Sequence, residues 1–206
     1  MRQVLALVIV AALLIASPLS VYAGKYPEPS IYPISWQLKF KHGMPKRLVV
    51  GNDAYWYMTY TVTNNTGMEQ IWAPEFQMVD NEGKIIKAGH NVNPLAFEKI
   101  KQIEKIQFLV PAHKAMGDLH QGEDQAKDSV AIWKEPNPRM GTFKIYVKGL
   151  SGEVVVLKDD DGKEVKDADG PVLLKKTLEL TYAIYGDEFY PQRHEVHALG
   201  EKWVMR

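Results

Sequence analysis

The sequence predicts a mainly β protein, an antiparallel β-sandwich with one inserted α-helix at about residues 94–106. Three observations predict this class. Hydrophobic and polar residues alternate in segments along most of the chain, turns rich in Gly, Asn and Asp separate these segments, and one segment alone has hydrophobic residues at helical spacing. About eight short strands with such turns are typical of a sandwich. Because no internal repeat or composition break divides residues 36–206, we expect them to form a single domain.

The segment from Ala54 to Thr63 is the clearest predicted strand, because nearly every residue in it is aromatic or β-branched. Alternate residues of a strand point to opposite faces. One face carries Trp56, Met58, Tyr60 and Val62, and the other carries Tyr55, Tyr57, Thr59, Thr61 and Thr63. Alternation and turn spacing predict further strands at 36–40, 71–79, 84–87, 129–134, 142–148, 153–158, 174–185 and 201–206.

Asn93 and Pro94 begin the one predicted helix, since Asn is a favoured N-cap and Pro suits the first helical position. A hydrophobic stripe at every third residue would let this helix dock on a sheet. The stripe contains Phe97, Ile100, Ile103 and Ile106. It drifts around the helix axis, so we expect the helix to end near Lys105. Residues 112–128 have no sustained period and predict a long surface connection.

The N-terminus has the pattern of a secretory signal. Arg2 precedes an apolar run from Val4 to Ala16, and Val21-Tyr22-Ala23 supplies small residues at the positions that a signal peptidase reads. We expect residues 1–23 to be a signal peptide and residues 24–35, which are rich in proline, to be a tether. No second apolar run reaches spanning length, so no membrane span is expected after cleavage.

Composition excludes several classes of function. The chain has 25 basic and 25 acidic residues and no basic block, so nucleic acid is not an expected partner. It has no cysteine, which excludes disulfides, thiolate zinc sites, iron–sulfur clusters and thiol nucleophiles. An exported chain without cysteine fits a bacterial periplasm or cell exterior, and no cofactor is predicted.

Two resemblances add to this interpretation. The strand that ends at Val62-Thr63-Asn64-Asn65-Thr66-Gly67 resembles exported bacterial immunoglobulin-like domains, which implies an immunoglobulin-like sandwich. Gly122-Glu123-Asp124, the segment 128–133 and Gly149-Leu150-Ser151-Gly152 resemble an uncharacterised family of secreted bacterial proteins. The second resemblance implies no activity.

Histidines supply the candidate metal ligands. His194 and His197 are three residues apart and would share a face on a helix, although on a strand they would point to opposite sides. His113 and His120 lie in a loop that also contains Met116, and His, Met and carboxylate ligands together are typical of copper or zinc handling. The alternative interpretation of both segments is a solvated surface.

Two further patterns have alternative interpretations. The acidic segments 159–162 and 167–170 could hold Ca²⁺, but neither has the acid spacing of an EF-hand loop, and Asp-Gly is an ordinary hairpin turn. Tyr55 and Tyr57 could form an exposed aromatic platform for a sugar or a protein. If a docked helix covers them, they are core residues instead.

The sequence has neither a Gly-x-Ser-x-Gly nucleophile motif nor a phosphate-binding P-loop. The leading hypothesis is therefore an exported, non-enzymatic binding or assembly module of the bacterial cell envelope. It would contact an envelope protein or a cell-surface polymer through an edge strand, the 112–128 loop or the aromatic face. The alternative is a periplasmic copper- or zinc-binding protein, and a hydrolase whose carboxylates come from distant strands stays open.

Overall fold

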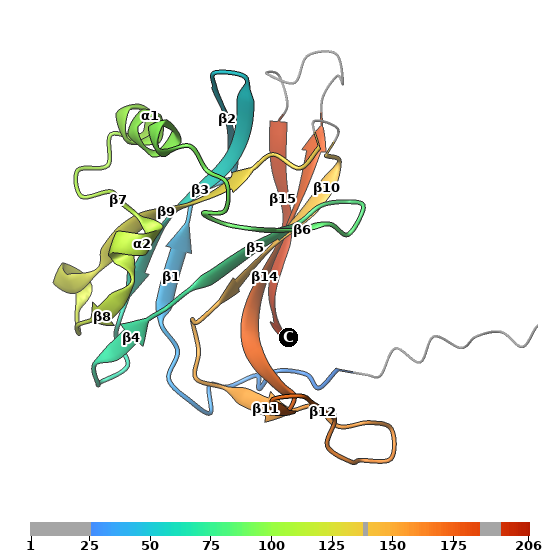
Figure 1. The fold of residues 1–206 in the computed structure, drawn as a ribbon. Helices are drawn as coiled ribbons and strands as arrows, with labels where there is room; N and C mark the ends of the chain where they lie inside the picture. The colour runs from blue at the N-terminus through green and yellow to red at the C-terminus, as the bar shows by residue number, and fades with distance from the viewer. Residues whose placement is uncertain (1–25, 138–139, 186–194) are drawn as a thin grey trace, which may run out of the picture.

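The computed structural model describes residues 26–137, 140–185 and 195–206. Within them the protein is mainly β, and two larger sheets face each other across a hydrophobic core (Figure 1). The five-stranded sheet contains β1 (Lys39–His42), β2 (Lys46–Val50), β3 (Asp53–Thr63), β7 (Val110–Pro111) and β9 (Lys127–Lys134). The six-stranded sheet contains β5 (Glu75–Val79), β6 (Ile85–Lys87), β10 (Thr142–Lys148), β11 (Val154–Val156), β14 (Leu173–Tyr185) and β15 (Glu195–Met205). Two small sheets pair β4 (Gln70–Trp72) with β8 (Gly117–Leu119) and β12 (Lys166–Asp167) with β13 (Gly170–Pro171).

The main core lies between the two larger sheets and uses the alternation expected from the sequence. Trp56 and Met58 of β3 are at most 1% exposed and face this core, as do Phe143 and Ile145 of β10. The ring of Trp56 lies 5.6 Å from that of Phe143 across the core. Burial of each such side chain contributes about 1.5–3 kcal/mol, so packing is a major source of stability in this chain without disulfides.

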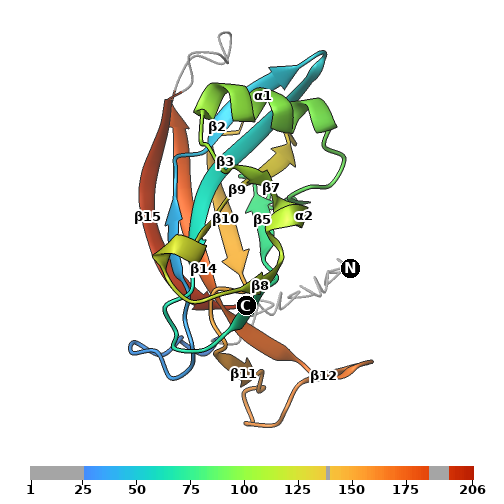
Figure 2. The same cartoon turned by 90° about the vertical axis from the view of Figure 1, so that its left-hand side faces the viewer.

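Strand β3 is buried on both faces, which decides the role of its tyrosines. Tyr55 and Tyr57 are 1% and 3% exposed, and they pack in a second hydrophobic cluster with Ala96 and Ile100 of helix α1 (Pro94–Glu104). Figure 2 shows α1 lying across the outer side of β2 and β3. The predicted surface platform of Tyr55 and Tyr57 is therefore wrong, because α1 covers that face, and the core interpretation is confirmed.

Helix α1 begins and ends where its sequence predicts, but its buried face includes Ala96 and leaves out Ile103 of the predicted stripe. The Asn93 side chain accepts a hydrogen bond from the Leu95 N–H, and the helix ends at Lys105 in a left-handed conformation with φ 54°. Ala96 and Ile100 are fully buried, whereas Ile103 is 54% exposed. Each three-residue step rotates the side chain by about 60° around the helix axis, so Ile103 turns away from the sheet, whereas Ala96 and Ile100, four residues apart, share the buried face.

A polar cluster anchors the last turn of α1 to the sheet below it. The Tyr57 hydroxyl donates a hydrogen bond of 2.7 Å to Glu104, and the Lys46 ammonium lies 2.9 Å from the same carboxylate oxygen. Burial of Glu104 opposes its ionisation, but the hydrogen bonds from Lys46 and Tyr57 outweigh burial and lower the pKa of Glu104. The carboxylate therefore stays charged to a lower pH than an ordinary Glu and holds the helix end.

Glu104→Gln is expected to lower the free energy of unfolding by about 1 kcal/mol near neutral pH, because a neutral amide binds Lys46 less strongly. A lowered folded-state pKa means that the carboxylate stabilises the fold above the ordinary Glu pKa of about 4.3, and that this contribution is lost as the pH falls through the folded value. The difference between wild type and variant should therefore shrink below about pH 4. Urea denaturation at neutral pH and in acid measures it, and an equal difference under both conditions would contradict the assignment.

The structure corrects two of the predicted segments. The strand expected over 71–79 breaks at Ala73 and Pro74 into β4 and β5, which pair with different partners. The surface connection expected over 112–128 contains helix α2 (Ala112–Ala115), β8 and a 3₁₀ turn (Glu123–Gln125). Ala115 and Leu119 in it are fully buried. These elements are too short to show a period in the sequence, and they are held by tertiary contacts.

The N-terminal segment, residues 26–35, is docked on the body and does not form a free tether. The Ser30 N–H donates a hydrogen bond of 2.8 Å to Glu153, and the Lys176 ammonium donates one of 3.0 Å to the Ser30 carbonyl. Lys176 and Glu153 form an ion pair of 3.1 Å, and both side chains are only 2% exposed. The predicted signal peptide, residues 1–23, lies outside the described residues.

The C-terminal strand is longer than expected. The sequence predicts it over 201–206, but β15 starts at Glu195 and pairs antiparallel with β14 along its length, with a register shift at Thr181 and Tyr182. Met205 at its end is 4% exposed, as expected for an apolar terminus that docks. Within the described residues β15 pairs with β14 alone and forms an edge of its sheet.

The acidic segments form turns, as the hairpin interpretation predicts. The Asp159 carboxylate accepts hydrogen bonds from the N–H groups of Asp161 and Lys163, and the Asp167 carboxylate accepts one from Asp169. Each carboxylate thus closes its own turn by a local bond to the backbone. Of the helices in the described ranges, none has the length and apolar character needed to cross a bilayer.

Candidate functional site

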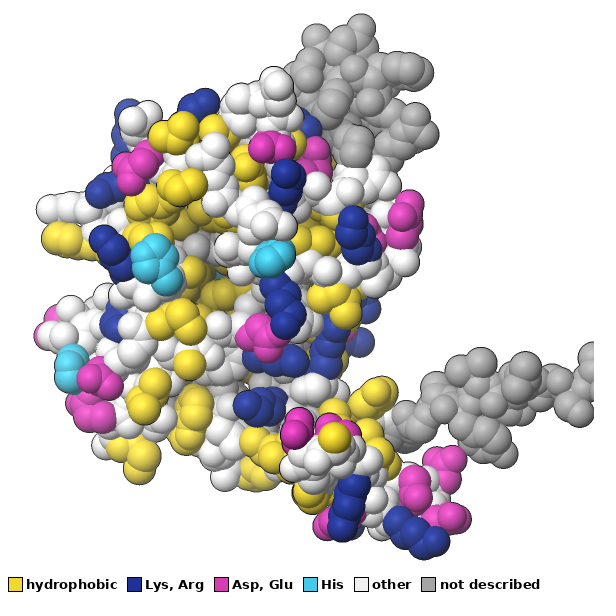
Figure 3. Space-filling model, viewed as in Figure 1, with side chains coloured by type: hydrophobic (Ala, Val, Ile, Leu, Met, Phe, Trp, Pro, Cys, Tyr) yellow, Lys and Arg dark blue, Asp and Glu magenta, His cyan; other side chains and the backbone are white. Residues whose placement is uncertain are grey.

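An open apolar groove lies between α1, α2 and strands β5, β6 and β9, where the two hydrophobic clusters meet. Its volume is about 750 Å³. Figure 3 has the same view as Figure 1, with α1 and α2 on the left, and shows hydrophobic side chains in the hollow beside these helices. The apolar part of its wall is contributed by Phe76, Val92, Phe97, Met116, Val130 and Ile132.

Local backbone contacts explain how the groove is built. After β6, the Ala88 N–H donates to the carbonyl of Phe76, and the Gly89 N–H donates to the carbonyl of Ile132 at 2.8 Å. Gly89 has φ +77°, a conformation that favours glycine, so the chain can turn from one sheet toward the other at this point. The loop then reaches Asn93, which caps α1, and thereby places Phe97 in the wall of the groove.

Charged side chains also line the groove, namely those of Glu75, Lys87, Glu98 and Lys114. Lys87 lies 3.9 Å from Glu75 on one side, in an exposed ion pair. Lys114 on the other side is exposed and has no ion-pair partner within the described residues. A mainly apolar lining with a few charged side chains suits an extended ligand that is apolar on one side and polar on the other.

The predicted metal ligands are distributed over the molecule. His113 lies in the groove wall near Met116, whereas His120 pairs with Glu69 at 2.6 Å. His197 lies on β15, 3.5 Å from Glu195, with its ring 5.0 Å from the ring of Tyr185.

Across residues 26–137, 140–185 and 195–206, no group of three or more His, Asp or Glu side chains is placed to hold a metal ion. His194 lies outside the described residues. His197 lies in strand β15, Glu195–Met205, so the prediction that pairs it with His194 is not tested. Of the three predicted histidines that the structure describes, His113 alone lines the groove.

Sequence reasoning did not find the groove. Its lining residues come from segments between Pro74 and Ile132 that belong to both sheets and both helices. Phe97 and Val130 have the pattern of core residues, and no local signal distinguishes a residue at the edge of the core from one inside it. Pro94 and Pro111 both line the groove. Because proline interrupts regular structure, these two residues are the one local pattern that indicates a change of chain direction on each side of α1.

Comparisons of the chain with protein-family models, with curated proteins and with solved structures found no match. The functional assignment therefore depends on the geometry of the described residues.

Proposed function

We propose that this chain is an exported, non-enzymatic binding module of the bacterial cell envelope, built on an immunoglobulin-like sandwich, and that its groove binds an apolar, extended segment of an envelope protein. The predicted signal peptide supports export. The arrangement of two mainly antiparallel sheets around one core supports the sandwich.

The observation that carries the proposal is the groove itself. Most of its lining residues are hydrophobic, yet the hollow of about 750 Å³ is open. Met116 is 45% exposed at its edge, an unfavourable position for a thioether that nothing covers. An extended peptide that places alternate apolar side chains in the groove would remove this surface from water, and each buried side chain would contribute about 1.5–3 kcal/mol before the cost of ordering the peptide.

Photo-crosslinking tests this proposal directly. With a benzoyl-phenylalanine residue in place of Met116, irradiation of bacterial cells that produce the protein should give one reproducible adduct with an envelope polypeptide. The matched control is the same replacement at Met68, which is 61% exposed and lies outside the groove, and it should give no such adduct. Adducts at neither position, or the same adducts at both, would contradict the proposal.

The same experiment separates the two kinds of partner expected from the sequence. Mass spectrometry of the adduct at position 116 distinguishes a peptide from a saccharide. With a purified partner, Met116→Glu should weaken binding about tenfold or more, because the new carboxylate must be desolvated when the groove is filled. Met68→Glu should leave the affinity unchanged.

A further inference from the structure

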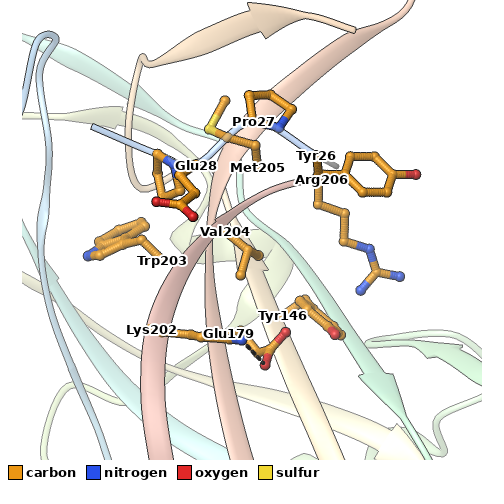
Figure 4. A pocket seen from close by; sticks show the side chains of 11 residues that line it. Tyr26, Pro27, Glu28, Tyr146, Glu179, Lys202, Trp203, Val204, Met205 and Arg206 are labelled. Carbon is orange, nitrogen blue, oxygen red and sulfur yellow. Dashed lines mark ion pairs between the residues drawn. The ribbon is translucent and has the colours of Figure 1, made fainter. Parts of the chain in front are cut away.

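A second hollow, here called the β15 pocket, lies on the outer face of the six-stranded sheet, between the N-terminal segment and the end of β15 (Figure 4). Its volume is about 650 Å³, and it shares no lining residue with the groove. It is more polar than the groove. The side chains that matter for its chemistry are those of Tyr26, Glu28, Tyr146, Glu179, Lys202 and Arg206.

Strand register brings the polar side chains into one row. Tyr146 of β10 lies opposite Glu179 of β14, and Glu179 lies opposite Lys202 of β15. Residues directly opposite each other on neighbouring strands point to the same face, so the three side chains lie side by side on the outer face of the sheet. Figure 4 shows Glu179 and Lys202 in contact, with Tyr146 next to them.

Two ammonium groups share the buried carboxylate of this row. The Glu179 side chain is only 7% exposed, and it is shared by two ammonium groups, with Lys144 at 3.0 Å and Lys202 at 3.7 Å. Burial opposes the ionisation of Glu179, but the hydrogen bonds from Lys144 and Tyr146 outweigh burial and lower its pKa, so it is a carboxylate near neutral pH. Glu28 adds a second carboxylate, so the lining of the pocket carries two acids, Glu28 and Glu179, and two bases, Lys202 and Arg206.

Arg206 is oriented but has no carboxylate partner. Its guanidinium carbon lies 3.8 Å from the centre of the Tyr146 ring, so the ring holds the planar group by a cation–π contact. Within the described part of the chain no carboxylate forms an ion pair with Arg206. A guanidinium that is fixed on an aromatic ring, with its N–H groups free, is preorganised to bind a carboxylate through two parallel hydrogen bonds.

We propose that the β15 pocket binds an acidic saccharide, with the carboxylate of a uronate unit on Arg206 and the sugar ring against Tyr26. The Tyr26 side chain is 59% exposed and lies beside Arg206 (Figure 4). The C–H-bearing face of a sugar ring packs on an exposed aromatic face, while Glu28 and Lys202 are placed to hydrogen-bond the hydroxyl groups. Because Arg206 has no carboxylate partner within the described residues, the pocket favours a uronate over a neutral sugar. This site is independent of the groove and of the peptide proposed to bind there.

Isothermal titration of the whole protein with trigalacturonate tests the proposal. The matched neutral ligand is the fully methyl-esterified trisaccharide, which keeps the sugar rings and removes the charge. Trigalacturonate should bind about tenfold or more tightly than the ester, and its affinity should fall with added salt, since the recognition is electrostatic.

Arg206→Gln should weaken trigalacturonate binding about tenfold and leave the weak binding of the ester unchanged. The variant keeps the backbone hydrogen bonds between residues 206 and 175, and thermal unfolding checks that it folds. The matched control, Lys99→Gln, removes one positive charge from an exposed position on α1 and should have no effect. No binding of trigalacturonate, equal binding of acid and ester, an unaltered affinity in Arg206→Gln, or equally tight binding of inorganic phosphate would each overturn the proposal.

Discussion

Gly149→Ala is expected to lower the free energy of unfolding by about 3 kcal/mol or more, which corresponds to a fall in melting temperature of roughly 6–12 °C for a chain of this size. Two causes add at this position. Gly149 has φ +89°, where any residue with a Cβ is strained by about 1–2 kcal/mol. A Cβ there would also lie 2.9 Å from the carbonyl oxygen of Ala73 and 3.3 Å from the Cα of Pro74.

The second cause makes the effect large, because the obstructing atoms are backbone. Ala73 and Pro74 connect β4 to β5, and Gly149 follows β10, the strand that pairs with β5. Neither backbone can move without disturbing this pairing.

Gly67→Ala is the matched control for Gly149→Ala. Gly67 has nearly the same φ, +87°, but a Cβ there would meet nothing within 4 Å. It should therefore show the strain alone, about 1–2 kcal/mol. Thermal unfolding of the two variants measures the difference, and equal shifts would show that the contact with Ala73 and Pro74 does not contribute.

Lys176→Met is expected to lower the free energy of unfolding by about 3 kcal/mol near neutral pH, because it leaves the buried carboxylate of Glu153 without its cation. It also removes the hydrogen bond to the Ser30 carbonyl, so the N-terminal segment loses one of its two bonds to this ion pair. Denaturant unfolding measures the loss, and the double variant Lys176→Met with Glu153→Leu should recover most of it, since no unpaired charge then remains.

The pH dependence identifies the cause of this loss. Burial opposes the ionisation of Glu153, but the bonds from Ser30 and Lys176 outweigh burial and lower its pKa. In the wild type the carboxylate therefore stabilises the fold above the ordinary Glu pKa of about 4.3, and this contribution is lost as the pH falls through the lower folded value. In Lys176→Met the protonated acid is no longer penalised, so the deficit should shrink below about pH 4. A deficit that stays constant into acid would mean that lost packing, not the unpaired charge, causes it.

Lys39→Met supplies the comparison at the surface. Lys39 and Glu123 form an ion pair of 2.5 Å, but their side chains are 44% and 62% exposed. Water and salt screen such a pair, so its removal should change the melting temperature far less than the removal of Lys176 does. A comparable change in both variants would argue against the special role of the buried pair.

Sequence reasoning succeeded where the cause of structure is local. β3 was predicted from its β-branched and aromatic residues, and α1 was predicted from Asn93 and Pro94, because strand alternation and helix capping involve residues within a few positions of each other. It failed over 112–128, where α2 and β8 are too short to have a period. It also underestimated β15, since the polar residues from Glu195 to Lys202 are held in a strand by hydrogen bonds to β14 and not by their own preference.

By itself the sequence determined that this is a mainly β protein with one longer helix and no disulfide. It also assigned the side chains of β3 to the correct two faces of the strand. Only the tertiary structure decided that Tyr55 and Tyr57 are core residues, since that depends on where α1 docks. The sites were decided in the same way. The groove and the β15 pocket each join residues that are far apart in the chain, and so do the hydrogen bonds of Ser30 with Glu153 and Lys176. The distance between such residues is set by strand pairing and packing, which no local sequence pattern reveals.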